Sequence, residues 1–150
     1  MASGGNLTPG TRVGQAQFLV EDLRAAVDEA HRLGLPVTVH AHGSRPVIDA
    51  LEAGVDGLEH VSFMTEDGVD PVPEVVFSML AERPVTLGLT LGARPGGGDL
   101  PPFMVERIPK LVANARALYE RGATLVIGSD AGIAPVKRTT CCRGRSGRRP

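Results

Sequence analysis

The segment PVTVHAHGSRPVIDALEAGVDGLEHVS, residues 36–62, decides the fold class. Its β-branched start, residues 36–40, predicts a short strand, and residues 57–61 predict a second one. Between them apolar residues recur at helical spacing, from Ser44, which can cap a helix, to Gly54, which can end one. A strand, a helix and a strand in this order predict a parallel βαβ unit.

The same alternation continues on both sides of this segment. Before the segment, the chain predicts a helix from Phe18 to Leu33, ended by Gly34. After the segment it predicts a helix over 73–83 and a strand over 85–90. A loop rich in Gly and Pro over 92–102, a helix over 109–121 and a strand over 124–128 follow. Four parallel βα units of this kind predict an α/β fold. The strands are expected to be apolar on both faces, because helices and a packed interior cover them.

Composition narrows the class of protein. The chain has 150 residues, of which 42% are hydrophobic and 22% charged, as expected for one ordinary domain. Aromatic residues make up only 3%, too few for a platform on which nucleic-acid bases stack. No apolar run is long enough for a membrane span, and the first residues carry no secretory signal. With the adjacent Cys141 and Cys142 forming no spaced metal motif, a cytoplasmic location is expected.

Polar side chains gather where the predicted strands end. His40 closes the first strand with His42 two residues later, His60 closes the second, and Asp130 follows the last. Because the carboxyl ends of parallel strands share one edge of a sheet, these groups are expected to converge. Imidazoles and a carboxylate suit a divalent metal ion such as zinc, although His40 alone would be interpreted as a structural histidine.

Other polar residues have simpler interpretations. His31 lies on a predicted helix and is expected to be a surface or boundary histidine. Thr90 and Ser129 are expected to bond to the backbone.

Three motifs, VTVHAHG (37–43), AGVDGLEHVS (53–62) and VIGSDAGI (126–133), occur in an order that resembles the amidohydrolase superfamily. The resemblance is to its imidazolonepropionase-like and prolidase-like metal-dependent hydrolases and covers about residues 1–137, which form the predicted domain. A His-x-His pair also ends the first strand of that family's barrel. The long helix before His40 and the single βα step to His60 favour the fifth strand instead.

The resemblance implies a TIM-like (β/α)8 barrel that hydrolyses carbon–nitrogen (amide or imide, non-peptide or dipeptide) or ester-like bonds of a small-molecule substrate with a metal-activated water. It implies that His40, His60 and Asp130 bind one or two divalent metal ions, with zinc expected. Asp130 would also transfer the proton of the water, as a catalytic residue. His42 is expected to bind the substrate.

Two further parts of the family's site have no counterpart in this chain. A His-x-His pair on the first strand and a bridging lysine on the fourth strand would precede Met1. The chain is therefore expected to be the C-terminal half-barrel of such a hydrolase. The alternative function is a catalytically inactive half-barrel fragment. A half-barrel is also expected to leave one face of its core in water, and its open edges are expected to favour self-association.

Residues 138–150 form a basic tail of five arginines without an acid, while the rest of the chain has 11 basic and 17 acidic residues. A basic tail can bind nucleic acid, but the preferred interpretation is a disordered tail with no such partner. If the tail is encoded by GC-rich codons, restoring one base before the codon of Arg138 shifts the reading frame, and RTTCCRGRSG becomes PHDVLPRAVG. Similar proteins continue in this way, and we therefore expect the tail to be frameshifted.

Overall fold

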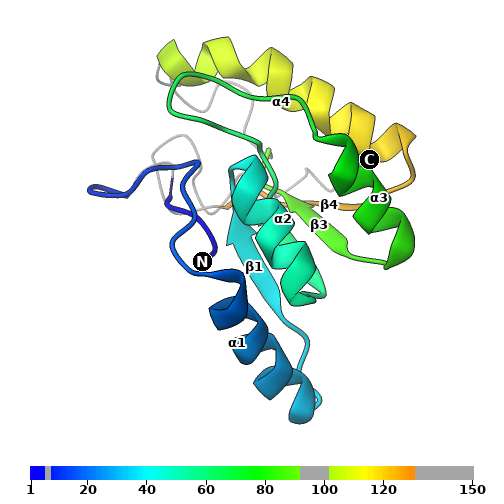
Figure 1. The fold of residues 1–150 in the computed structure, drawn as a ribbon. Helices are drawn as coiled ribbons and strands as arrows, with labels where there is room; N and C mark the ends of the chain where they lie inside the picture. Colours follow the sequence, from blue (N-terminus) through cyan, green and yellow to red (C-terminus); the bar gives the residue numbers. More distant parts are fainter. Residues whose placement is uncertain (6–7, 92–101, 131–150) are drawn as a thin grey trace, which may run out of the picture.

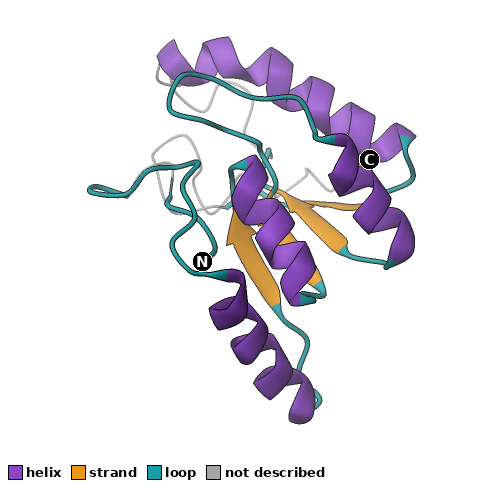
Figure 2. Ribbon diagram, viewed as in Figure 1, coloured by secondary structure: helices purple, strands orange, loops and turns teal. Residues whose placement is uncertain are grey.

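Four parallel strands form one sheet at the centre of the structure, a computed structural model that describes residues 1–5, 8–91 and 102–130 (Figures 1 and 2). The elements follow in the order α1 (Val20–Arg32), β1 (Thr38–Ala41), α2 (Ser44–Ala53), β2 (Gly57–His60), α3 (Glu74–Glu82), β3 (Thr86–Leu89), α4 (Pro102–Glu120) and β4 (Thr124–Ile127). The strands lie in sequence order, β1-β2-β3-β4, and each neighbouring pair is parallel. The predicted α/β fold of four βα units is confirmed. Consecutive order, without a reversal, is the arrangement found along the wall of a (β/α) barrel.

One face of the sheet is the core. Val39, Leu58, Leu87 and Leu125 stand opposite one another in a row across the four strands, and the first three are buried. Apolar side chains of all four helices, among them Val27, Val47, Val76 and Leu118, pack in the same cluster. The apolar residues that recur at helical spacing in the sequence therefore form the sides of the helices that pack on this face of the sheet.

The opposite face of the sheet is open to solvent, as expected for a half-barrel, but it is not the apolar face that the strands were expected to present. Thr38, Thr86 and Thr124 lie in one row on this face, and all three are exposed. On β4 the apolar side chain of Val126 also reaches solvent, at 54% exposure. The described residues supply no layer that packs over this face, so the expectation of strands apolar on both sides was wrong here.

Glycines end two helices as predicted, because each adopts a left-handed conformation that other residues seldom take. Gly34 follows α1 with φ of 72°, and Gly54 follows α2 with φ of 95°. The start of α2 was predicted wrongly. Ser44 is its first helical residue and makes no side-chain cap, because the helix begins one residue earlier than expected, with the carbonyl of Gly43 accepting the N–H of Val47 at 3.1 Å.

Helix α4 also starts before its predicted position. It begins at Pro102 and includes Pro109, which was expected to be near its first residue. A proline inside a helix leaves one carbonyl without its partner, but this turn is exposed, so water can satisfy that carbonyl. The predicted loop, residues 92–102, falls outside the described residues except for Pro102. None of the four described helices combines the length and apolar character that crossing a membrane requires.

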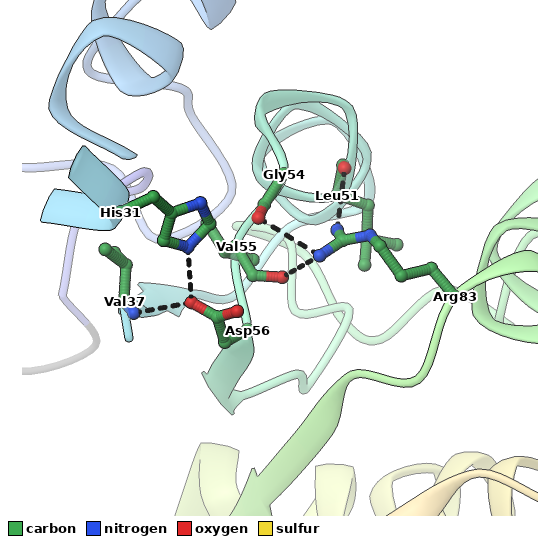
Figure 3. Close-up of polar contacts among 7 residues, drawn as sticks. All are labelled: His31, Val37, Leu51, Gly54, Val55, Asp56 and Arg83. Carbon is green, nitrogen blue, oxygen red and sulfur yellow. Dashed lines mark hydrogen bonds and ion pairs between the residues drawn. The ribbon is translucent and has the colours of Figure 1, made fainter. Parts of the chain in front are cut away.

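At the amino ends of β1 and β2, Asp56 joins two segments (Figure 3). Its Oδ2 lies 2.8 Å from His31 Nε2 and accepts the backbone N–H of Val37 at 2.7 Å. The contact with the His31 ring, followed by the Val37 N–H, lowers the pKa of Asp56. His31 is exposed, as predicted, and its contact ties the end of α1 to the start of the sheet.

Arg83 also joins two segments near Asp56, because it binds the end of α2 (Figure 3). Its guanidinium donates to the carbonyls of Leu51, Gly54 and Val55 at the end of α2, with distances between 2.6 and 3.3 Å. The last carbonyls of a helix lack partners within it, so this one side chain satisfies groups that would otherwise need water. The contacts of Asp56 and Arg83 therefore stabilise the amino end of the sheet.

Candidate metal centre

Three histidines meet at the other end of the sheet, where β1 and β2 finish. One ring nitrogen of each of His40, His42 and His60 lies within 4.8 Å of the others. The ring centroids are 4.5 to 4.7 Å apart, with His42 and His60 nearly parallel at 22° and His40 set edge-on to both. His42 is buried and the other two are half-buried. The expected convergence of the histidines at one edge therefore occurs.

His60 reaches this group because the backbone departs from strand geometry. Alternate residues of a strand face opposite sides, so His60 should share the core side with Leu58 and with Ala41, its partner in the register. Its φ of 73° and the φ of 45° at Val61 turn the chain at this point. Positive φ is rare for a residue with a side chain, and costly for a β-branched one. The bend brings the imidazole to His40, which lies on the other parity.

The first residues of the chain hold β1 from its outer side. The N–H of Ala2 donates to the carbonyl of His40 at 2.8 Å, and His40 Nε2 lies 3.1 Å from the carbonyl oxygen of Gly4. The hydroxyl of Ser3, fully buried, accepts the backbone N–H of His42 at 3.0 Å. This segment therefore fixes both the backbone of the His-x-His pair and one ring.

Hydroxyl groups contact the two other rings. His42 Nδ1 lies 2.8 Å from Ser62 Oγ, and His60 Nδ1 lies 2.9 Å from Thr90 Oγ1. Sequence reasoning missed Ser62 and interpreted Thr90 as a backbone-bonding residue. The available signal was position, since Thr90 closes a predicted strand and Ser62 directly follows one, just as the histidines lie at or shortly after strand ends.

The donor set fits a divalent cation that prefers nitrogen. Around a tetrahedral zinc ion with Zn–N bonds of about 2.1 Å, ligand nitrogens lie about 3.4 Å apart. The ring nitrogens lie within 4.8 Å of one another, which is compatible with a shared cation and somewhat wider than this spacing. Three histidines leave room for a further ligand, the coordination of catalytic rather than structural zinc.

Asp130 stands apart from this group. It follows β4 after Gly128 and Ser129, is half-buried, and has a positive φ of 52°. The cluster of metal-binding side chains among the described residues consists of the three histidines and does not include it. Its predicted roles as metal ligand and proton carrier stay predictions. The sequence also assigned His42 to the substrate, whereas its ring lies as close to His40 and His60 as they lie to each other.

Comparison with known proteins assigns the chain to a family. The model of the amidohydrolase family matches residues 1–147. Ochratoxinase of Aspergillus niger is 36% identical over 85 residues, which are 57% of this chain and 18% of that protein. An uncharacterized protein of Mycobacterium tuberculosis is 30% identical over 117 residues, 76% of this chain and 28% of that protein. The chain thus spans less than a third of the length of these relatives.

Solved structures agree. A Xaa-Pro dipeptidase with bound methionine superposes with a TM-score of 0.69 at 26% identity, over 91% of this chain and 34% of that one. Ochratoxinase of A. niger gives a TM-score of 0.66 at 27% identity, over 87% and 30% of the two chains. The four βα units are therefore part of a TIM-like barrel, as expected. The predicted resemblance is confirmed, and the chain belongs to the amidohydrolase family.

Proposed function

We propose that the protein of which this chain forms at least a part is a metal-dependent hydrolase of carbon–nitrogen bonds, acting on amides or imides of small molecules or dipeptides, or on ester-like bonds. One observation carries the proposal, namely the approach of His40, His42 and His60 to one point at the carboxyl ends of β1 and β2. The relatives support an amide bond as the target, since a Xaa-Pro dipeptidase is named for the peptide bond that it cleaves.

In this proposal the three histidines hold a divalent cation, for which we propose zinc. When bound, such an ion lowers the pKa of water towards neutrality and polarises a carbonyl group. Their rings are half-buried or buried, which keeps competing solvent away from the nitrogens. His42 is assigned here to the cation rather than to the substrate, because of its place within the group.

Asp130 is proposed as the general base and acid. It would accept the proton of the water that attacks the carbonyl carbon, and would return that proton to the leaving nitrogen as the C–N bond breaks. The order of the chain supports this role, since Asp130 follows β4 as the histidines follow or end β1 and β2, and the carboxyl ends of parallel strands share one edge.

Metal analysis combined with hydrolysis tests the proposal. The purified chain, stripped with a chelator and supplied with zinc, is expected to bind about one ion, as a three-histidine site does. His40→Ala and His60→Ala should each lose it. His31→Ala is the matched control, because His31 lies at the opposite end of the sheet and should leave zinc binding unchanged.

Hydrolysis is then assayed on Xaa-Pro dipeptides, N-acyl amino acids and aryl esters. Turnover that disappears in Asp130→Asn, with zinc retained, supports the assigned role of this carboxylate. A chain that binds no zinc and hydrolyses none of these compounds contradicts the proposal for this chain. That result favours the alternative, an inactive half-barrel fragment.

A further inference from the structure

Each of the three site histidines has one ring nitrogen in contact with a specific group of the protein. For His40 that nitrogen is Nε2, which faces the carbonyl of Gly4, an acceptor only. For His42 and His60 it is Nδ1, which faces a hydroxyl. A carbonyl accepts a hydrogen bond and cannot donate one, so the proton of neutral His40 is on Nε2, and Nδ1 carries the lone pair.

The two hydroxyls come from the neighbouring strand in each case. His42 follows β1, and its partner Ser62 follows β2. His60 ends β2, and its partner Thr90 follows β3. Both contacts therefore cross between adjacent strands, over 20 and 30 residues of sequence, and the distances of 2.8 and 2.9 Å are those of good hydrogen bonds.

Ser62 is itself held in place. Its Oγ accepts the backbone N–H of Met64 at 3.4 Å, and Met64 is buried. A hydroxyl has two lone pairs, so this bond leaves one for the Nδ1–H of His42. The bend that starts at His60, the last residue of β2, and continues through Val61 and Phe63, all with positive φ, brings this hydroxyl beside the ring. Backbone strain here is the cost of placing both His60 and Ser62 at one edge.

The choice of nitrogen decides whether a ring can bind a cation. A neutral imidazole carries one N–H and one lone pair, and only the lone pair coordinates a metal. When the Nδ1–H donates to Ser62 or Thr90, the lone pair lies on Nε2. A partner on the other nitrogen also stops rotation of the ring, which is why such outer partners affect metal affinity.

We infer that Ser62 and Thr90 are positioning residues, which fix His42 and His60 as Nδ1–H tautomers and direct their Nε2 atoms towards the shared point that His40 faces with Nδ1. The inference rests on the proposed function for the statement that this point receives a cation. The hydrogen bonds and the tautomers do not depend on it, and they can be measured without metal.

Zinc affinity tests the consequence. Thr90→Val keeps the shape of the side chain and removes the hydroxyl that contacts His60. Ser62→Ala removes the hydroxyl that contacts His42. Each should weaken zinc binding by about 10- to 100-fold, the usual effect of losing an outer partner. Thr90→Ser retains the hydroxyl and should restore affinity to within about threefold of the original. Thr86→Val is the matched control, since Thr86 is an exposed threonine at the start of β3, the strand that Thr90 follows, and it should leave zinc affinity unchanged.

Nitrogen-15 NMR of the metal-free chain, recorded at a pH above the titration observed for each ring, gives the independent readout. His42 and His60 should show protonated Nδ1, and His40 should show protonated Nε2. Thr90→Val should convert His60 to a mixture of tautomers and leave His42 unchanged, and Ser62→Ala should do the reverse. If wild-type His42 or His60 carries its proton on Nε2, the inference is overturned.

The two proposals can fail separately. The predicted tautomers in a chain that does not bind zinc support the positioning role and contradict the proposed function. Zinc bound with equal affinity by wild type, Thr90→Val and Ser62→Ala overturns the positioning role and leaves the proposed function standing.

Discussion

Asp49 carries a carboxylate inside the helical layer. It lies on α2 with only 4% of its surface exposed. Arg45 Nε is 2.7 Å away as an ion pair, but the arginine side chain itself is 71% exposed and shielded by water. Burial therefore raises the pKa of Asp49 above its ordinary value, and the attraction of Arg45 offsets this only in part.

This shift predicts that Asp49 costs stability at neutral pH. A carboxyl group whose pKa is higher in the folded state destabilises that state once it is ionised, and the cost disappears as the pH falls below the unfolded value of about 4. Asp49→Asn should therefore raise the urea midpoint at pH 7, with a gain that shrinks towards pH 4. Asp28→Asn, at an exposed position of α1, serves as control. A lower midpoint for Asp49→Asn at pH 7 would show that the Arg45 pair outweighs burial.

The residues of the site could be chosen from the sequence, but their partners could not. Their position after predicted strands was sufficient to select His40, His42 and His60. The bend that joins His60 to them needs positive φ at His60 and Val61, which is uncommon for residues with a side chain and costly for a β-branched one, so the sequence does not predict it. The hydroxyl partners are 20 and 30 residues away in sequence, and only the register of the sheet brings them close.

At the scale of elements, Gly34 after α1 and Gly43 before α2 differ in the space around them. Gly34 adopts a positive φ in open space, whereas Gly43 packs against the backbone of another loop. A Cβ on Gly43 would lie 2.8 Å from the Cα of Gly14 and closer still to its carbonyl oxygen. The contact holds the loop that includes Gly14 against Gly43, which follows His42 and precedes α2.

Gly43→Ala should therefore disturb the site as well as the fold. We expect it to lower the free energy of unfolding by about 1–3 kcal/mol, as overpacking does, and to weaken zinc binding. Gly34→Ala should cost about 1–2 kcal/mol through backbone strain alone and leave zinc affinity unchanged. Chemical denaturation and zinc titration measure the two quantities. Equal zinc affinities for both variants would mean that the loop at Gly14 does not support His42.

The elements themselves were largely predictable, and the errors have local causes. Helix ends at Gly34 and Gly54 follow from glycine geometry, which is encoded in one residue. The start of α2 was misplaced because the preference of serine for a cap is weak against packing. The start of α4 was misplaced because a proline was expected only in the first turn, whereas Pro109 lies inside this helix, at an exposed position, despite a cost of about 3 kcal/mol. The exposure of the second face of the sheet cannot be derived from the strands themselves, because it depends on what covers the sheet; it was expected only from the half-barrel interpretation.

At the scale of the whole molecule, the face of the sheet away from the helices and the strand β4 remain open within the described chain. Val126 is 54% and Ile127 65% exposed, although both lie in a strand. Among the described residues β4 pairs only with β3, so its other edge offers unpaired backbone groups. Exposed apolar strands at an edge are sites at which further strands add. We propose that, as an isolated chain, the protein associates with itself through this edge.

Charges on β4 should suppress this association, because a lysine at an edge strand opposes pairing. Sedimentation velocity over a range of concentrations is expected to show oligomers for the wild type. We expect the combined Val126→Lys and Ile127→Lys substitutions to weaken the association by at least about tenfold, or 1.4 kcal/mol. Val112→Lys is the matched control, since Val112 is equally exposed, at 53%, but lies on α4. Dissociation by the α4 variant alone would place the contact on that helix, and a wild type that stays monomeric would mean that the open edge of β4 is already protected.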